Sequence, residues 1–180
     1  MKTITFFNNK GGVGKTSLVY HLAWMLEELG HRVITADLDP QANLSGMFLG
    51  EARLAELWES ESAVTVERSI HPLFEGSGDI ADSPYLEKLG ERIGLLVGDL
   101  ALSKWEDHLS IAWPMSVEED KRAIRDTTAF ARTIERAADA FDADLALVDV
   151  GPNLGAINRA AMIASDYVVI PLAPDLFSLQ

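Results

Sequence analysis

The sequence predicts a doubly wound α/β fold, in which a mainly parallel β-sheet carries helices on both faces. Strand-like and helix-like segments alternate along the chain, the pattern of this fold class. The runs 93–97 and 145–150 are apolar throughout, as in strands that are buried on both faces. A glycine-rich loop also joins the first strand to the first helix. A strand, loop, helix and second strand in this order imply a parallel pair with a right-handed crossover.

The individual elements follow from apolar periodicity and from turn residues. The expected strands are rich in apolar and β-branched residues and are residues 3–8, 32–37, 93–97, 145–150 and 167–171. The expected helices carry apolar residues on one face and are residues 16–29, 54–58, 117–141 and 156–164. Gly30 is suited to end the first helix, and Pro114 is expected to break the segment before it. Residues 64–74 and 100–113 show no decisive period, and residues 75–79 form a turn or mobile loop.

One domain is expected over residues 1–180, because the sequence shows no repeat, low-complexity tract or linker. Its middle, residues 51–122, is a variable acidic segment. Residues 175–180 have the character of the start of another helix. We therefore expect the chain to lack a C-terminal part of its domain.

Charge and composition exclude several classes of protein. The 180 residues carry 15 Lys and Arg against 28 Asp and Glu, a net charge of −13. Residues 51–122 hold 16 of the acids and seven of the bases, whereas residues 1–50 are neutral. The absence of cysteine excludes disulfides, thiolate metal sites and cysteine-held iron–sulfur clusters. No signal peptide or membrane-spanning stretch is visible, so a cytoplasmic protein is expected.

The strongest functional signal is the glycine-rich segment 10–16 (KGGVGKT), a phosphate-binding loop (P-loop). Glycines let backbone N–H groups turn toward phosphate oxygens, and the following helix adds the positive end of its dipole. Lys15 can reach the β- and γ-phosphates, and the Thr16 hydroxyl can bind Mg²⁺. The loop is a variant, since Asn9 stands where the usual pattern has its first glycine. The predicted nucleotide-binding residues are Lys10, Gly11, Gly12, Val13, Gly14, Lys15, Thr16 and Ser17.

Acidic residues follow two other predicted strands. Asp37 and Asp39 end the strand 32–37 in the sequence DLDPQ, and Asp149 ends the apolar run 145–148. Ligands of open α/β sheets bind at the carboxyl ends of strands, so these acids should face the phosphates. They can hold Mg²⁺ or orient an attacking water, although a single Asp at such a place often only caps a turn. The predicted metal-binding residues are Thr16, Asp37 and Asp149.

The segment 151–155 (GPNLG) leaves two interpretations open. Its two glycines allow a mobile loop that senses the γ-phosphate. An ordinary turn into a helix, with Asn153 as the N-cap, fits equally well. On the first interpretation the switch loops include Pro40, Gln41, Gly151 and Pro152.

Residues 8–16, 37–41 and 147–152 resemble the ParA/MinD family of deviant Walker-A ATPases, and most closely its ParA branch. That branch positions plasmids, chromosomes and other cargo. Residues 171–179 are similar to the stretch after the family's next strand. The resemblance implies the P-loop NTPase fold, and it covers both ends of the chain but little of residues 51–122.

The resemblance also implies roles for single residues. Lys10 would reach across an ATP-sandwiched homodimer to the partner's nucleotide, much as an arginine finger does. Outside this motif, Lys10 would be an ordinary solvated lysine. Lys15 would be the P-loop lysine, and Thr16 would be a Mg²⁺ ligand. Asp39 would position or activate the hydrolytic water. Asp37 would support the magnesium shell, and Asp149 would be the Walker-B acid. The implied catalytic residues are thus Lys10, Lys15 and Asp39.

The function implied is a switch in which Mg·ATP closes a dimer and slow hydrolysis opens it. A partner protein, often with a basic segment, would stimulate hydrolysis, and the acidic residues 51–122 suit such a partner. Family members bind DNA non-specifically through C-terminal helices, so the intact protein is expected on the nucleoid. This acidic chain should bind DNA weakly or not at all.

Three alternatives remain open. A biosynthetic ligase or small-molecule kinase can use the same P-loop scaffold. A MinD-like membrane switch needs an amphipathic C-terminal helix, which is not seen before Gln180, so no membrane partner is predicted. A nucleotide-gated scaffold that does not hydrolyse ATP would need only the dimerisation.

Overall fold

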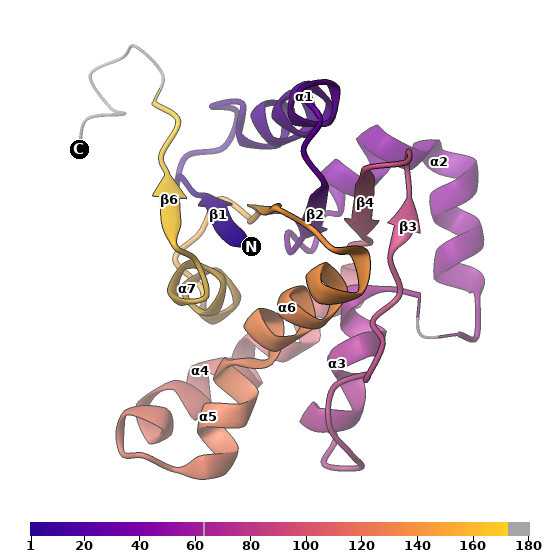
Figure 1. Cartoon of the computed structure of the whole chain (residues 1–180). Coiled ribbons are helices and arrows are strands. Elements are labelled where there is room, and N and C mark those ends of the chain that lie inside the picture. The colour runs from indigo at the N-terminus through magenta and orange to yellow at the C-terminus, as the bar shows by residue number, and fades with distance from the viewer. Residues whose placement is uncertain (63, 173–180) are drawn as a thin grey trace.

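The computed structural model describes residues 1–62 and 64–172, and Figure 1 shows its elements. The strands are β1 (Lys2–Phe6), β2 (Val33–Asp37), β3 (Glu87–Lys88), β4 (Ile93–Leu96), β5 (Leu145–Asp149) and β6 (Tyr167–Val169). The α-helices are α1 (Lys15–Glu28), α2 (Asn43–Glu59), α3 (Val66–Phe74), α4 (Trp105–Val117), α5 (Lys121–Thr127), α6 (Ala129–Phe141) and α7 (Ala156–Ile163). A 3-10 helix, Leu100–Lys104, leads into α4.

The six strands form one sheet in the order β3-β4-β2-β5-β1-β6. All neighbouring pairs are parallel except β3 and β4, which are antiparallel. Strand β5 lies between β2 and β1, so the carboxyl ends of these three strands meet at the centre of one sheet edge. The predicted doubly wound, mainly parallel sheet is confirmed.

Helices cover both faces of the sheet, because alternate strand residues point to opposite sides. On β2, Val33 packs with α1, whereas Ile34 and Ala36 pack in the larger cluster that contains α6 and α7. Figure 1 shows α1 and α2 on one side of the strands and α6 and α7 on the other. Helices α4 and α5 form a hairpin that lies beyond α6 and α7, away from the sheet.

The expected single helix over 117–141 is wrong. Helix α4 ends at Val117, a turn follows in which Glu119 has a φ of 64°, and two separate helices come next. The side chain of Asp120 accepts a 2.8 Å hydrogen bond from the Ala123 N–H and so starts α5 as its N-cap. At Thr128 the backbone leaves the helical region (ψ 3°), which separates α5 from α6.

Two other expectations fail in the middle of the chain. Pro114 does not break its helix but lies inside α4, which continues for three more residues. The helix expected over 54–58 is the second half of α2, which already begins at Asn43. Gly50, with a φ of 71° and a ψ of 166°, kinks α2 between its two halves. The undecided segment 64–74 forms α3.

The remaining observations concern membrane spans, the edge strand β6 and the last residues of the chain. No helix in the described part of the chain is long and apolar enough to cross a bilayer. Strand β6 lies at one sheet edge, within the predicted strand 167–171. The helix start expected at 175–180, and residues 173–179 of the family resemblance, lie outside the described residues.

Candidate active site

The P-loop runs from the end of β1 to the start of α1, as predicted. Gly12 and Gly14 have φ values of 75° and 85°, in the left-handed region that favours glycine, so the loop curls before the helix begins. Gly14 is the N-cap of α1 and offers no side chain to cap it. Apart from its direct chain neighbours, no heavy atom of the described residues lies within 4 Å of the place where a Cβ would stand at Gly11, Gly12 or Gly14. The loop thus has open space beside it at a helix N-terminus, which suits an anion.

Asn8 fixes the start of the P-loop. Its buried side chain accepts a 2.8 Å hydrogen bond from the backbone N–H of Lys10 through Oδ1. Its Nδ2 donates to the carbonyl oxygen of Pro171 at 2.7 Å. The side chain therefore ties the loop to the chain that follows β6. Asn8 lies within the motif of the family resemblance, but the spacing gave no sign of this structural role.

Lys15 and Thr16 form the first turn of α1, next to β5. The Lys15 side chain is mostly buried, with 7% relative exposure for the residue. The Thr16 hydroxyl donates a 2.7 Å hydrogen bond to Oδ2 of Asp149. The structure thus brings together two of the three predicted metal-binding residues, Thr16 and Asp149. Ser17 is exposed and Lys10 is half-buried.

Asp37 and Asp149 end adjacent strands and lie opposite each other in register. Both are fully buried. Burial raises the pKa of Asp37 to about 7, with a further rise from the negative charge of Asp149 and an opposing effect from hydrogen bonds of Ser45. Burial also raises the pKa of Asp149 to about 6, while the Thr16 hydrogen bond and the charge of Lys15 lower it. The site concentrates negative charge that is not fully neutralised.

Two buried carboxylate oxygens at this site, Oδ1 of Asp37 and Oδ1 of Asp149, have no hydrogen-bond partner among the described residues. Unpaired buried oxygens of this kind are costly unless a donor or a cation meets them. Carboxylate and hydroxyl oxygens are also the ligands that Mg²⁺ prefers. The residues present therefore fit a magnesium site.

Asp39 lies between the two predicted switch loops. Its Oδ1 accepts a 3.0 Å hydrogen bond from the N–H of Gln41, so it also forms the local turn that a strand-end Asp often makes. A Cβ placed on Gly151 would stand 3.3 Å from the same oxygen. The turn of Pro40 and Gln41 therefore meets the segment 151–155 at Asp39. Pro152 is exposed at the surface.

Asn153 is not the N-cap of α7, which corrects the second interpretation of segment 151–155. The N-cap is Gly155, and the Asn153 side chain accepts a 2.8 Å hydrogen bond from the Gly155 N–H instead. A carboxylate from a different helix, that of Glu106, accepts from the first N–H groups of α7. Turn residues alone cannot show such a partner, because it lies far away in sequence.

Ser45 and Gly98 support the site and were missed by the sequence analysis. The N–H and the hydroxyl of Ser45 both donate to Oδ2 of Asp37, at 2.7 and 2.8 Å. The Ser45 hydroxyl accepts in turn from the Gly98 N–H at 2.8 Å. Gly98 follows the predicted strand 93–97 directly, which is the one signal that could have placed it at the edge of the sheet with the acids.

Comparison with known proteins decides the family. The family described as "AAA domain" matches residues 1–180, the whole chain. The chain belongs to this family. Protein IncC of Escherichia coli is 30% identical over 180 residues, which are 100% of this chain and 42% of IncC. The virulence plasmid ParA family protein pGP5-D of Chlamydia psittaci is 29% identical over 184 residues, 99% of this chain and 60% of that protein.

These relatives confirm the ParA/MinD resemblance of this AAA domain chain. The chain spans about two fifths to three fifths of the length of the first curated relatives it matches. Among solved structures, protein DIP2308 of Corynebacterium diphtheriae has a TM-score of 0.88 at 33% identity and covers 99% of this chain and 61% of its own. Cobyrinic acid a,c-diamide synthase of Mycobacterium smegmatis, solved with ADP and magnesium, shares the fold (TM-score 0.69, 24% identity, 96% and 60% covered).

Proposed function

We propose that this chain is the nucleotide-binding part of a ParA-like ATPase that binds Mg·ATP at the P-loop. The observation that carries the proposal is the hydrogen bond between Thr16 and Asp149, which joins the P-loop helix to the acid-bearing strand ends. The open space beside Gly11, Gly12 and Gly14 supports it, because phosphates need room at backbone N–H groups. The expected Mg²⁺ and ATP also agree with the ligands of the diamide synthase, which was solved with ADP and magnesium and with an ATP analogue and magnesium.

The proposed magnesium site uses Thr16, Asp37 and Asp149. In the described residues no three acidic or histidine side chains are grouped so that they could hold a metal by themselves. This agrees with the usual coordination of Mg²⁺, which is bound by one or two carboxylates together with substrate phosphates and water. Bound there, Mg²⁺ would neutralise charge on the phosphate oxygens. Thr16 and Asp149 would face the ion, and Ser45 would hold Asp37 in place behind them.

Three other residues would act on the phosphates and on water. The ammonium group of Lys15, held in the first turn of α1, would neutralise the β- and γ-phosphates. Asp39 would accept a hydrogen bond from the attacking water and so orient it, between the turn of Gln41 and the segment at Gly151. Lys10 would add a second positive charge from the partner subunit and complete the site in a dimer.

The larger function proposed is the positioning or partitioning of DNA or another cargo by an ATP-dependent dimer. The relative pGP5-D, which is named as a virulence plasmid ParA family protein, supports it. A stimulating partner with a basic segment and non-specific DNA would be the other components. The net charge of −13 favours the basic partner and disfavours DNA on this chain.

Neutralising exposed acids of α2, such as Glu51 and Glu56, should weaken stimulation of hydrolysis by the basic partner. Unchanged stimulation would contradict docking of the partner on these acids.

Sedimentation velocity with ATP and with ADP tests the switch. ATP should produce dimers and ADP monomers. Lys10→Ala should remove the ATP dimer, and Asp39→Ala should trap it by slowing hydrolysis. Lys88→Ala is the matched control, because Lys88 is exposed on β3 at the opposite side of the sheet. Monomers in every nucleotide state would overturn the switch.

A biosynthetic ligase or kinase is the second candidate, favoured by the fold shared with the diamide synthase. That likeness is at the level of fold, whereas the match to the ParA family protein pGP5-D covers 99% of this chain. The same experiment separates the two. A ligase would remain in one oligomeric state with ATP and ADP and would turn over ATP only after a small-molecule substrate is added.

A further inference from the structure

Helices α4 and α7 make a contact through one carboxylate. Glu106, in the first turn of α4, accepts hydrogen bonds from the backbone N–H of Ala156 and from that of Ile157, the latter at 3.2 Å. These N–H groups belong to the first turn of α7. Glu106 and the helix it caps are 50 residues apart in the sequence. Helix α4 precedes β5 in the chain, and α7 follows it.

Helix α7 depends on the Glu106 carboxylate because its own N-cap residue has no side-chain acceptor for the first N–H groups. The first N–H groups of a helix need acceptors from outside the helix. Gly155, the N-cap, has no side chain, and the Asn153 side chain is engaged by the Gly155 N–H. The fit is close, since a Cβ on Gly155 would stand 2.5 Å from Oε1 of Glu106. A negative charge at this end also interacts favourably with the helix dipole.

The capped helix in turn holds the segment 151–155. Asn158, buried in α7, donates from Nδ2 to the carbonyl oxygens of Gly151 and Asn153, each at 2.7 Å. Gly151 is the residue that approaches Oδ1 of Asp39. Hydrogen bonds thus link Glu106, through α7 and Asn158, to Gly151, which lies next to the Asp39 carboxylate.

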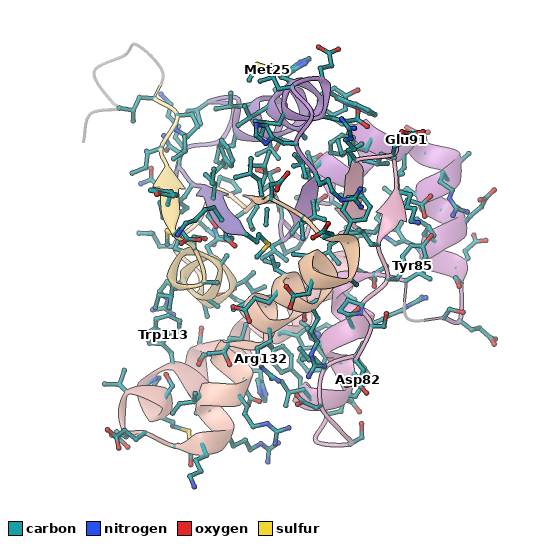
Figure 2. The ribbon with its side chains drawn as sticks, in the orientation of Figure 1. Met25, Asp82, Tyr85, Glu91, Trp113 and Arg132 are labelled. Carbon is teal, nitrogen blue, oxygen red and sulfur yellow. The ribbon has the colours of Figure 1, made fainter. Side chains whose placement is uncertain are left out.

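A second contact joins the same two helices. The guanidinium of Arg159, on α7, lies 4.9 Å from the ring centroid of Trp113, on α4. Figure 2 labels Trp113 between α7 and the α4–α5 hairpin. The hairpin of α4 and α5 packs on α7 and α6 and stands outside the sheet layers (Figure 1). Any displacement of the hairpin would therefore act on the first half of α7 through two contacts, those of Glu106 and of Trp113.

We propose that Glu106 is a positioning residue for the segment 151–155, and that through it the α4–α5 hairpin adjusts the site of ATP hydrolysis. By fixing the first turn of α7, Glu106 sets where Gly151 lies relative to Asp39 and to the γ-phosphate. The proposal rests on the proposed function, because it needs ATP at the P-loop. It assigns to the acidic middle segment a part in catalysis that requires no contact with the nucleotide.

The test compares Glu106→Ala and Glu106→Gln with Asp107→Ala, an exposed acid in the same turn of α4. Steady-state ATPase assays give kcat and KM, and titrations give the Kd for ADP and for a non-hydrolysable ATP analogue. Loss of a charged helix cap is expected to lower kcat about fivefold and to weaken the ATP analogue about as much. The Kd for ADP should stay within about twofold, because ADP lacks the γ-phosphate that the segment 151–155 is proposed to contact. Glu106→Gln, which keeps one acceptor, should recover part of the loss, and Asp107→Ala should match the wild type.

Other outcomes overturn the proposal and differ from failure of the proposed function. If Glu106→Ala and Glu106→Gln keep the wild-type kcat and the wild-type preference for the ATP analogue over ADP, Glu106 has only a structural role. An equal loss of affinity for ADP and for the analogue points to general unfolding and also overturns the proposal. Thermal unfolding of Glu106→Ala and of Glu106→Gln shows whether each variant is folded. If the wild type binds neither nucleotide, the proposed function itself fails.

Discussion

The hydroxyl of Thr16 donates a 2.7 Å hydrogen bond to Oδ2 of Asp149, so the first turn of α1 and the end of β5 meet at one point. The bond has a simple origin in the topology. Strand β5 pairs with β1 on one side and with β2 on the other, which brings Asp149 next to both the P-loop and Asp37. A site for a metal and a phosphate chain forms where these elements end.

Removing the Thr16 hydroxyl should weaken Mg²⁺-dependent nucleotide binding. Thr16→Ala takes away an oxygen ligand and leaves Asp149 Oδ2 without its donor, so the affinity for Mg·nucleotide should fall about tenfold or more. Affinity measured without Mg²⁺ should change little. Fluorescent ADP titrated with and without Mg²⁺ gives both values. Thr16→Ser keeps the hydroxyl and should behave as wild type; equal losses in the two conditions would contradict the assignment.

The buried Asp37 should make the metal-free protein less stable as pH rises. Its pKa is about 7 in the folded chain, above the value of about 4 expected when unfolded. Between these values the folded state binds more protons, so the free energy of unfolding falls by up to about 1.4 kcal/mol per pH unit. The loss is complete above pH 7 and absent below pH 4.

Urea unfolding of the metal-free protein from pH 5 to pH 8 measures this effect. Asp37→Asn keeps an acceptor for Ser45 but cannot ionise, so it should be more stable than wild type at pH 8, with the difference shrinking toward pH 5. Asp139→Asn, at an exposed position on α6, is the control and should keep the wild-type slope. Added Mg²⁺ should stabilise the wild type more at pH 8 than at pH 5. A wild-type slope unchanged in Asp37→Asn would contradict the burial argument.

Gly98 leaves no room for a side chain behind Asp37. A Cβ there would stand 2.9 Å from both Cγ and Oδ2 of Asp37, whose position Ser45 fixes. Gly98→Ala should therefore cost about 1–3 kcal/mol of stability through overpacking. Gly46→Ala is the matched control, because in the described residues no heavy atom outside its own stretch of α2 backbone lies within 4 Å of its Cβ position. Gly46→Ala should be neutral or slightly stabilising, and the two variants behaving alike in urea unfolding would contradict this account.

The sequence predicts the parts of this fold whose signals are local. The strand, glycine loop and helix around Lys15 follow from short-range chemistry, and so do the acids at the ends of β2 and β5. Helix boundaries between residues 100 and 141 do not. Apolar periodicity runs on through the N-cap at Asp120 and the break at Thr128, and Pro114 is tolerated inside α4.

The contacts that shape the site arise from distant parts of the chain, which explains why they could not be predicted. Gly98 lies near Asp37 only because β4 pairs with β2, and its N–H reaches Asp37 through the Ser45 hydroxyl. Glu106 reaches α7 only because the α4–α5 hairpin folds back on it. No spacing in one sequence encodes such partners, since each depends on the packed fold.

Calorimetric titration of the chain with ATP in the presence of Mg²⁺ tests the central claim, Mg·ATP binding at the P-loop, most directly. The wild type and Lys88→Ala should bind one ATP per chain, and the binding should weaken strongly when Mg²⁺ is removed. Lys15→Ala should lose measurable binding while it remains folded. Failure of the wild type to bind, or the same affinity in Lys15→Ala as in the wild type, would contradict the account.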